Sequence, residues 1–236
     1  MNFFKLFTKS RSKNNLNQTE YDYYKQLFVK NPYWNKPSPN AEEQLRWDII
    51  EGFVTDVKNN FYKSTDEKFT ILDLGCGRGW LTFLLSKYGN IVGIEPVKPV
   101  LQYAKKMFPN IKFICGTTKD LIHENKEYKT YDLIVSSEVI EHIPDDEKGN
   151  FVEDISKLLN KKGFLIITTP RKDAQEEWNT YMKPDQPIED WISEKELETL
   201  VVQKGFIKHK MERFSIPPVD GAPEIEIYQL WLFQKI

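Results

Sequence analysis

Three glycines, each separated by one residue, follow a run of apolar residues in the segment 70–81, TILDLGCGRGWL. Gly75, Gly77 and Gly79 permit a tight turn and let a ligand approach the backbone closely. The apolar run predicts a buried strand and the residues after Gly79 a helix. The loop therefore lies at the carboxyl end of a strand, where open α/β sheets bind ligands. Asp73, just before the loop, favours a ligand that carries positive charge.

Two kinds of cofactor bind to a loop of this type. Dinucleotide sites have the spacing G-x-G-x-x-G, whereas this loop has G-x-G-x-G. Asp73 would repel a pyrophosphate but not the positively charged amino-acid part of S-adenosylmethionine (SAM). The next expected strand ends at Glu95, and a carboxylate about 20 residues beyond such a loop can accept hydrogen bonds from both ribose hydroxyls. The loop and Glu95 together predict a SAM site.

A second group of reactive side chains lies in the segment 137–142, SEVIEH. If residues 138–142 form a helical turn, Glu138, Glu141 and His142 share one face, because they are spaced by three and four. Two carboxylates and an imidazole can bind a divalent metal, and this oxygen-rich set suits Mg²⁺ or Mn²⁺. The same groups could instead serve as metal-free acid–base or positioning groups, with His142 as the base, or be purely structural.

Short β-rich runs alternate with helical stretches through most of the chain, which predicts βαβ units and a parallel sheet. A helix is expected at 41–61, since Leu45, Ile49, Phe53 and Val57 repeat every four residues. The last two strand-like runs have no helix between them and predict an antiparallel hairpin. Strands are expected at 69–74, 91–95, 111–115, 131–136, 163–169, 206–214 and 225–233, and further helices at 79–88, 97–107, 148–159 and 193–204. The expected fold is α/β: a Rossmann-like, doubly wound sheet of seven strands, mostly parallel, with an N-terminal helical cap.

The chain divides into a tail and one domain. Residues 1–20 are basic and polar with an aromatic opening, which predicts a mobile tail that could make weak contact with a membrane surface. Residues 21–236 are interpreted as one domain, in which 21–62 form the cap. Residues 171–191 form a long connection at the carboxyl ends of the strands, as expected of a substrate-side insertion. Its Trp178, Tyr181, Met182 and Trp191 could line a pocket or simply hold the insertion in place.

Composition limits the choice of partners and compartment. The formal net charge is −2, which argues against nucleic acid as a partner, because nucleic-acid binders usually carry a basic face. No apolar stretch approaches the length of about 18 residues needed to span a bilayer, and the first residues do not resemble a signal peptide. The two cysteines are expected to be unpaired. The chain is therefore expected in the cytoplasm; its oligomeric state is left open.

On these motifs the chain resembles the class I SAM-dependent methyltransferases, from about residue 41 to the C-terminus. LDLGCGRGW looks like the family's first motif and GIEP like its acidic second motif. The resemblance implies that the region around Thr117 contacts adenine, although many members have an aspartate there. Arg46 resembles an arginine that pairs with the SAM carboxylate in ubiquinone-pathway O-methyltransferases; its alternative is an exposed helix arginine. The implied SAM-binding set is Arg46, Asp73, Gly75, Cys76, Gly77, Gly79, Glu95, Pro96, Thr117, Thr118 and Ser136.

Three functions follow as hypotheses. The first is methylation of a small molecule, at oxygen, with Glu138, Glu141 and His142 in the catalytic role. The second is 2′-O-methylation of an RNA 3′-end; the small-RNA enzymes resembled here use an E-x-x-E-H metal cluster with a further histidine, and 184–191 contains none. The third is a SAM-binding regulator without catalysis.

Overall fold

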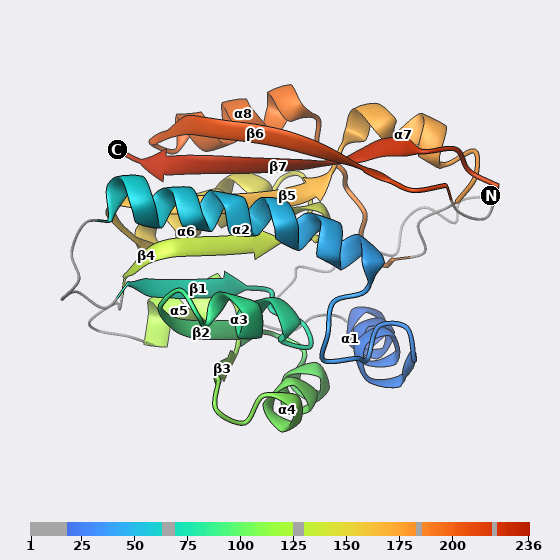
Figure 1. The fold of residues 1–236 in the computed structure, drawn as a ribbon, viewed down its shortest axis with the longest axis horizontal. Helices are drawn as coiled ribbons and strands as arrows, with labels where there is room; N and C mark the ends of the chain where they lie inside the picture. Colours follow the sequence, from blue (N-terminus) through green and yellow to red (C-terminus); the bar gives the residue numbers. More distant parts are fainter. Residues whose placement is uncertain (1–17, 63–68, 125–129, 183–185, 219–220) are drawn as a thin grey trace, which may run out of the picture.

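A twisted sheet runs through the molecule, with helices on both of its faces (Figure 1). The computed structural model describes residues 18–62, 69–124, 130–182, 186–218 and 221–236. Within them the sheet has seven strands in the order β3-β2-β1-β4-β5-β7-β6. The first five strands in this order are parallel, and β7 pairs antiparallel with both β5 and β6. The predicted seven-stranded, mostly parallel sheet with an antiparallel C-terminal pair is confirmed.

The strands have the following bounds: β1 Thr70–Leu74, β2 Asn90–Glu95, β3 Lys112–Cys115, β4 Tyr131–Ser137, β5 Leu159–Pro170, β6 Phe206–Ile216 and β7 Ile225–Lys235. The α-helices have the following bounds: α1 Gln18–Lys25, α2 Ala41–Phe61, α3 Trp80–Leu85, α4 Lys98–Met107, α5 Thr118–Glu124, α6 Lys148–Leu158, α7 Lys172–Trp178 and α8 Glu194–Gln203. Two short helices complete the set: the π-helix η1 Gln26–Lys30 and the 3₁₀-helix η2 Ile140–His142.

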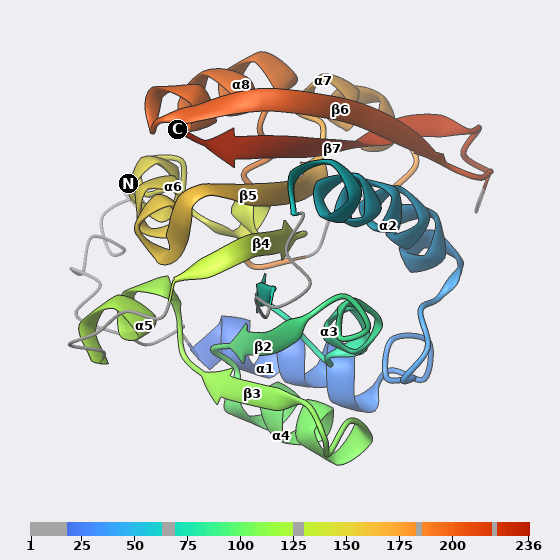
Figure 2. The same cartoon turned by 60° about the vertical axis from the view of Figure 1, so that its left-hand side comes forward.

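Two apolar layers hold the helices against the sheet, because successive residues of a strand point to opposite faces. Ile71 and Leu133 pack with α2 and α3 on one face, and Leu72 and Ile134 pack with α5, α6 and α8 on the other. Figure 2 shows α2 and α3 on one side of the central strands and α6 on the other. The central strands are thus buried on both faces, as expected of a parallel sheet.

Helix α2 begins with a reciprocal cap and buries a face slightly rotated from the predicted one. The Asn40 side chain accepts a hydrogen bond from the Glu43 backbone N–H, and the Glu43 side chain accepts one from the Asn40 backbone N–H. Leu45, the first residue of the predicted apolar stripe, is 37% exposed, whereas Trp47 and Ile50 are buried. Because 3.6 residues make a turn, a stripe of strict four-residue spacing drifts around the helix.

Three helices were not predicted. Gln18 begins α1 and Glu20 is buried, so the last residues of the predicted tail belong to the cap; residues 1–17 lie outside the described residues. Helix α5 begins just after β3, and α7 lies inside the insertion predicted as a loop. Each of these two helices is seven residues long, too short to give a clear helical period.

Arg78, the residue between the second and third glycines of the loop, anchors the cap to the sheet. Its guanidinium is bidentate to the Glu43 carboxylate, with both N–O distances at 2.6 Å, and it also donates to the carbonyls of Lys36 and Ser38. Arg78 is 1% exposed and Glu43 3%. Removing one partner of such a buried ion pair strongly destabilises the fold, because the other charge stays buried without its partner.

Replacing Arg78 with methionine should therefore lower the free energy of unfolding by about 3–5 kcal/mol, because the Glu43 carboxylate would stay buried without a counter-charge. Urea denaturation would measure this change. The exposed Arg213, which pairs with Glu194, is the matched control: Arg213→Met should cost no more than about 1 kcal/mol. Equal losses for the two variants would contradict the anchoring role of Arg78.

Candidate active site

The glycine loop turns at the carboxyl end of β1 with its backbone against the end of β2. Gly75, Gly77 and Gly79 have φ values of 74°, 50° and 88°, which disfavour residues with a side chain. The N–H groups of Gly75 and Cys76 both donate to the Ile94 carbonyl, at 2.9 and 3.0 Å. A Cβ on Gly75 would lie 2.5 Å from Cγ2 of Val139. Only a residue without a side chain therefore fits at position 75.

Glu95 lies beside the loop, as the motif spacing predicts. Its Oε2 accepts from the Gly77 N–H at 3.1 Å and its Oε1 from the Val97 N–H at 2.8 Å. Burial raises the pKa of this carboxyl to about 7. The two backbone donors fix the direction of the carboxylate, and each oxygen keeps a second lone pair for a ligand.

Asp73 lies under the same loop and is 1% exposed. Burial raises its pKa to about 7, while the Thr82 hydroxyl, which donates to it at 2.5 Å, acts in the opposite direction. The buried carboxyls of Asp73 and Glu95 thus lie next to the same glycine loop. A ligand that offers hydrogen-bond donors or positive charge would favour the ionised form of both.

A cavity of about 1020 Å³ opens from this loop toward the segment 138–142. The glycine loop, Glu95 and Pro96 line one part of it. Glu138, Glu141 and His142 line another part. Its volume is at the upper end of the range typical of small-molecule sites. Both groups of residues singled out in the sequence therefore face one cavity.

The cap contributes aromatic side chains to the wall of this cavity. Tyr24 and Phe28 stack at a centroid distance of 6.2 Å, and the Phe28 ring lies 3.6 Å from the position of a Cβ on Gly77. The rings of Tyr24 and His142 form a T-shaped pair with their centroids 5.8 Å apart. Both residues lie in the cap expected over residues 21–62, but neither was predicted to line the site. Their spacing of four on one helical face is the signal that could have identified them.

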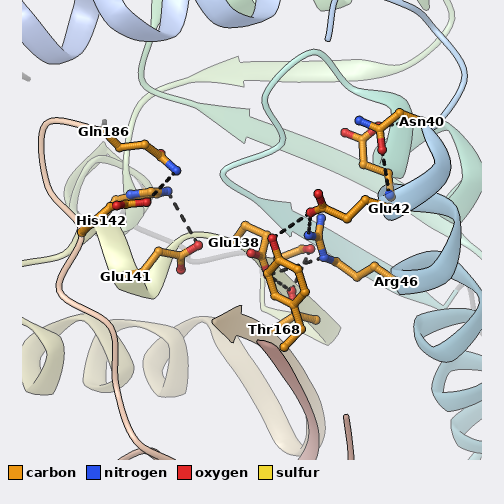
Figure 3. A network of polar contacts seen from close by, with 12 residues as sticks. Asn40, Glu42, Arg46, Glu138, Glu141, His142, Thr168 and Gln186 are labelled. Carbon is orange, nitrogen blue, oxygen red and sulfur yellow. Dashed lines mark hydrogen bonds and ion pairs between the residues drawn. The ribbon is translucent and has the colours of Figure 1, made fainter. Parts of the chain in front are cut away.

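Glu138 follows β4 in a left-handed backbone conformation, with φ at 56°. Its Oε1 accepts from the Thr168 hydroxyl at 2.8 Å and lies 3.5 Å from Nε of Arg46 (Figure 3). Burial raises its pKa to about 8, although the Arg46 charge lowers it. The positive φ at a residue with a side chain carries strain, which is commonly found at functional sites.

Arg46 is buried, and the interpretation as an exposed helix arginine is wrong. Its side chain is 5% exposed and pairs with Glu42 at 2.7 Å as well as with Glu138. The guanidinium lies over the ring of Tyr228, 4.8 Å from the centroid, and the Tyr228 hydroxyl donates to Glu42 at 2.8 Å. Tyr228 comes from β7, far along the chain, and no local sequence signal placed it here.

Glu141 and His142 lie together in η2, on the other side of the network in Figure 3. The Thr169 hydroxyl donates to Oε2 of Glu141 at 3.0 Å, and Oε1 lies 3.7 Å from Nε2 of His142. Nδ1 of His142 is 2.9 Å from the Ile188 carbonyl. Burial raises the pKa of Glu141 to about 7 and lowers that of His142.

The shared face of Glu138, Glu141 and His142 was expected only if residues 138–142 formed a helical turn, and the turn leaves out the first two of these residues. The 3₁₀-helix begins at Ile140, and the left-handed conformation of Glu138 turns this side chain toward Arg46 and Thr168 instead. Over the described ranges, no group of three or more His, Cys, Asp and Glu side chains has an arrangement that could hold a metal ion. The observed positions of Glu138, Glu141 and His142 thus do not fit a shared metal.

Three residues of the implied SAM-binding set lie away from the cavity wall. Thr117 immediately precedes α5, and its N–H and hydroxyl both donate to Asp120. Thr118 is buried near Asp154. Ser136 is fully buried, and the neighbouring Ser137 lines the cavity in its place. The alternation of strand β4 explains this, because adjacent residues point to opposite faces.

Two other members of that set differ in role. Cys76 lines the cavity, whereas Gly79 packs against the ring of Phe113, which would lie 2.8 Å from a Cβ at that position.

Of the aromatic residues noted in the insertion, Trp178 and Trp191 line the cavity, and Tyr181 is 46% exposed.

Two further predictions concern the chain as a whole. Both cysteines are free. Among the helices of the described ranges, none combines the length and the apolar character needed to cross a bilayer.

Comparisons with known proteins identify the family of the chain. Residues 65–212, more than half of the chain, match the family model described as a methyltransferase domain. The ubiquinone biosynthesis O-methyltransferase of Pelagibacter ubique is 28% identical over 170 residues, 67% of each chain. The malonyl-[acyl-carrier protein] O-methyltransferase of Halalkalibacterium halodurans is 34% identical over 110 residues, 44% of this chain and 40% of the relative.

The fold agrees as well. The N-methyltransferase NodS of Bradyrhizobium japonicum, solved in complex with S-adenosyl-L-homocysteine, superposes with a TM-score of 0.69 over 92% of this chain and 98% of its own, at 15% identity. The aligned parts span between 40% and 67% of the first two curated relatives. The match of the family model to most of the chain decides the family. The chain belongs to the methyltransferase-domain family, as a member of the class I SAM-dependent methyltransferases.

Proposed function

We propose that this chain is an enzyme that transfers the methyl group of SAM to an oxygen atom of a small molecule. One observation carries the proposal: a single cavity is lined both by the glycine loop with Glu95 and by Glu141 with His142. A methyl donor held by the first group would lie next to an acceptor held by the second. Such proximity is the main contribution that a protein makes to a direct transfer.

The residues present fit SAM. The two oxygens of Glu95 are fixed by backbone N–H groups and can accept from the ribose hydroxyls. Asp73 offers negative charge beneath the loop to the ammonium of the amino-acid part. Three cations line the described part of the cavity: Lys30, Arg46 and Arg78. The Arg78 donors are taken by the Glu43 carboxylate and by the Lys36 and Ser38 carbonyls, and Lys30 is exposed. Arg46 pairs with Glu42 and Glu138, but its buried Nε has no hydrogen-bond partner within the described residues, so it keeps a donor for the SAM carboxylate.

SAM supplies a methyl group on a positively charged sulfur, ready for attack by a nucleophile. The chain must then position the acceptor hydroxyl and remove its proton. Nδ1 of His142 is held by the Ile188 carbonyl, so Nε2 can accept this proton as a general base. Glu141 lies on the Nε2 side of the ring and would stabilise the imidazolium that forms. Because Glu138 pairs with Arg46, we derive no step through a metal.

Two considerations support oxygen as the acceptor atom. The relatives from Pelagibacter ubique and Halalkalibacterium halodurans are both named O-methyltransferases. A hydroxyl loses its proton during transfer, and His142 offers a base at the required place. The formal net charge of −2 favours a small molecule over the RNA alternative.

Glu95→Ala should weaken the binding of S-adenosylhomocysteine at least about tenfold, since both ribose contacts are lost and each contact to a charged group contributes roughly 1.5 kcal/mol or more. Isothermal titration calorimetry measures the affinity. Glu198→Ala, at an exposed ion pair with Lys208, is the control and should bind as the wild type does. An unchanged affinity in Glu95→Ala would contradict the ribose assignment.

Turnover tests the proposed function itself. The chain is incubated with SAM and a panel of hydroxyl-bearing small molecules, and S-adenosylhomocysteine and methylated product are measured by mass spectrometry. We expect release of both with at least one acceptor and none with the Glu95→Ala variant at limiting SAM. Binding of SAM without turnover of any acceptor, or turnover of an RNA 3′-end alone, would contradict the proposal.

A further inference from the structure

The last residues of the insertion are held at the end of the cavity where the acceptor is proposed to bind. The Asp190 N–H donates to the Glu141 carbonyl at 2.8 Å. On the other side, the fully buried side chain of Gln229 in β7 donates to the Ile192 carbonyl at 2.8 Å. Trp191 lies between these two contacts in the chain, so its backbone is fixed on both sides.

The Trp191 side chain lines the cavity and is 4% exposed, and its indole N–H is buried without a hydrogen-bond partner within the described residues. A buried indole N–H usually finds a partner. That of Trp231, for example, donates to Oε1 of Gln229 at 2.8 Å. An unpaired buried donor destabilises a fold and calls for an explanation. A ligand in the cavity that brings an oxygen to this N–H would supply one.

The surroundings of this N–H favour an uncharged oxygen. Trp191 belongs to a buried apolar cluster with Ile227, and Trp178 packs against the same cluster; all three line the cavity. One neutral donor in such a wall satisfies a carbonyl or ether oxygen, whereas a buried carboxylate would need a counter-charge as well. The buried arginines of the described cavity wall, Arg46 and Arg78, already pair with glutamates.

The oxygen that meets Trp191 differs from the oxygen that is methylated. The attacking hydroxyl must give its proton to a base, the role proposed for His142, and must keep a lone pair free for the methyl group. A hydrogen bond donated by the indole would occupy a lone pair of that oxygen and lower its nucleophilicity. A second oxygen bound by Trp191 would instead anchor the acceptor at two points and orient its hydroxyl for transfer.

We propose that the methyl acceptor carries, besides the hydroxyl that is methylated, an uncharged carbonyl or ether oxygen that accepts a hydrogen bond from the Trp191 indole N–H. The inference rests on the proposed function and narrows its substrate class to hydroxyl compounds with such a second oxygen. Trp191 is then a residue that determines specificity and positions the acceptor, in addition to its place in the apolar cluster.

Three probes of similar shape separate the effect of the second oxygen from that of size: 4-hydroxyacetophenone with a ketone, 4-isopropylphenol with an alkyl group, and 4-hydroxybenzoate with a carboxylate. Each is titrated by calorimetry into the chain saturated with S-adenosylhomocysteine. The 3-hydroxy isomers form a second series, in which the hydroxyl lies closer to the second oxygen. In at least one series we expect the ketone to bind about threefold to tenfold more tightly than the alkyl compound, as one net hydrogen bond implies, and the benzoate to bind most weakly.

Two variants assign the preference to the indole N–H. Trp191→Phe removes the N–H together with part of the ring, whereas replacement of Trp191 by 3-benzothienylalanine keeps the ring shape and has sulfur in place of the N–H. Both should abolish the preference for the ketone, and the second should leave the affinity for the alkyl compound unchanged. Trp47→Phe is the matched control: Trp47 is also 4% exposed but is not a cavity-lining residue, so this variant should keep the wild-type preference.

The outcomes separate this inference from the proposed function. Equal affinities for ketone and alkyl compound in both series, tightest binding of the benzoate, no binding of any probe, or a ketone preference that survives the 3-benzothienylalanine replacement would each overturn the role of Trp191. Loss of the preference in Trp47→Phe would do the same, because it would show an effect of the core and not of the N–H. In each of these cases turnover of a hydroxyl compound would still support the proposed function. Failure of S-adenosylhomocysteine itself to bind would overturn the proposed function, and the inference with it.

Discussion

The site depends on the position of the Glu95 carboxylate, which accepts hydrogen bonds from two backbone N–H groups. One comes from Gly77 in the loop after β1 and the other from Val97 after β2. This links the carboxyl ends of two neighbouring parallel strands, where helices must begin and backbone groups are otherwise unsatisfied. The loop can take this path because its glycines adopt positive φ. A rigid, buried acid at the crevice is the result.

Buried ion pairs then connect the other elements to this crevice. Arg78 ties the glycine loop to Glu43 at the start of α2, and Arg46, one turn further along α2, reaches Glu138 after β4. Such pairs add little net stability compared with apolar packing, but they fix geometry. Here they set the cap, α2 and the end of β4 at defined positions around one cavity. The strained backbone of Glu138 is held by its contacts to Arg46 and Thr168.

The elements that could be predicted are those with strong local patterns. Apolar runs located the strands, and the glycine spacing placed the loop beside Glu95. Three features lay beyond local pattern. The φ of Glu138 depends on its tertiary contacts, and Tyr228 reaches the site only through the antiparallel order of β7. The choice between Ser136 and Ser137 depends on strand register, since a shift of one residue exchanges the two faces.

The central claim is that SAM lies along the glycine loop with its ribose on Glu95 and its methyl group toward Glu141 and His142. A crystal structure of the chain with bound S-adenosylhomocysteine tests this most directly. The account predicts both ribose hydroxyls within hydrogen-bond distance of the Glu95 carboxylate and the sulfur facing the part of the cavity lined by His142. A nucleoside bound elsewhere, or a sulfur turned away from His142, would contradict it.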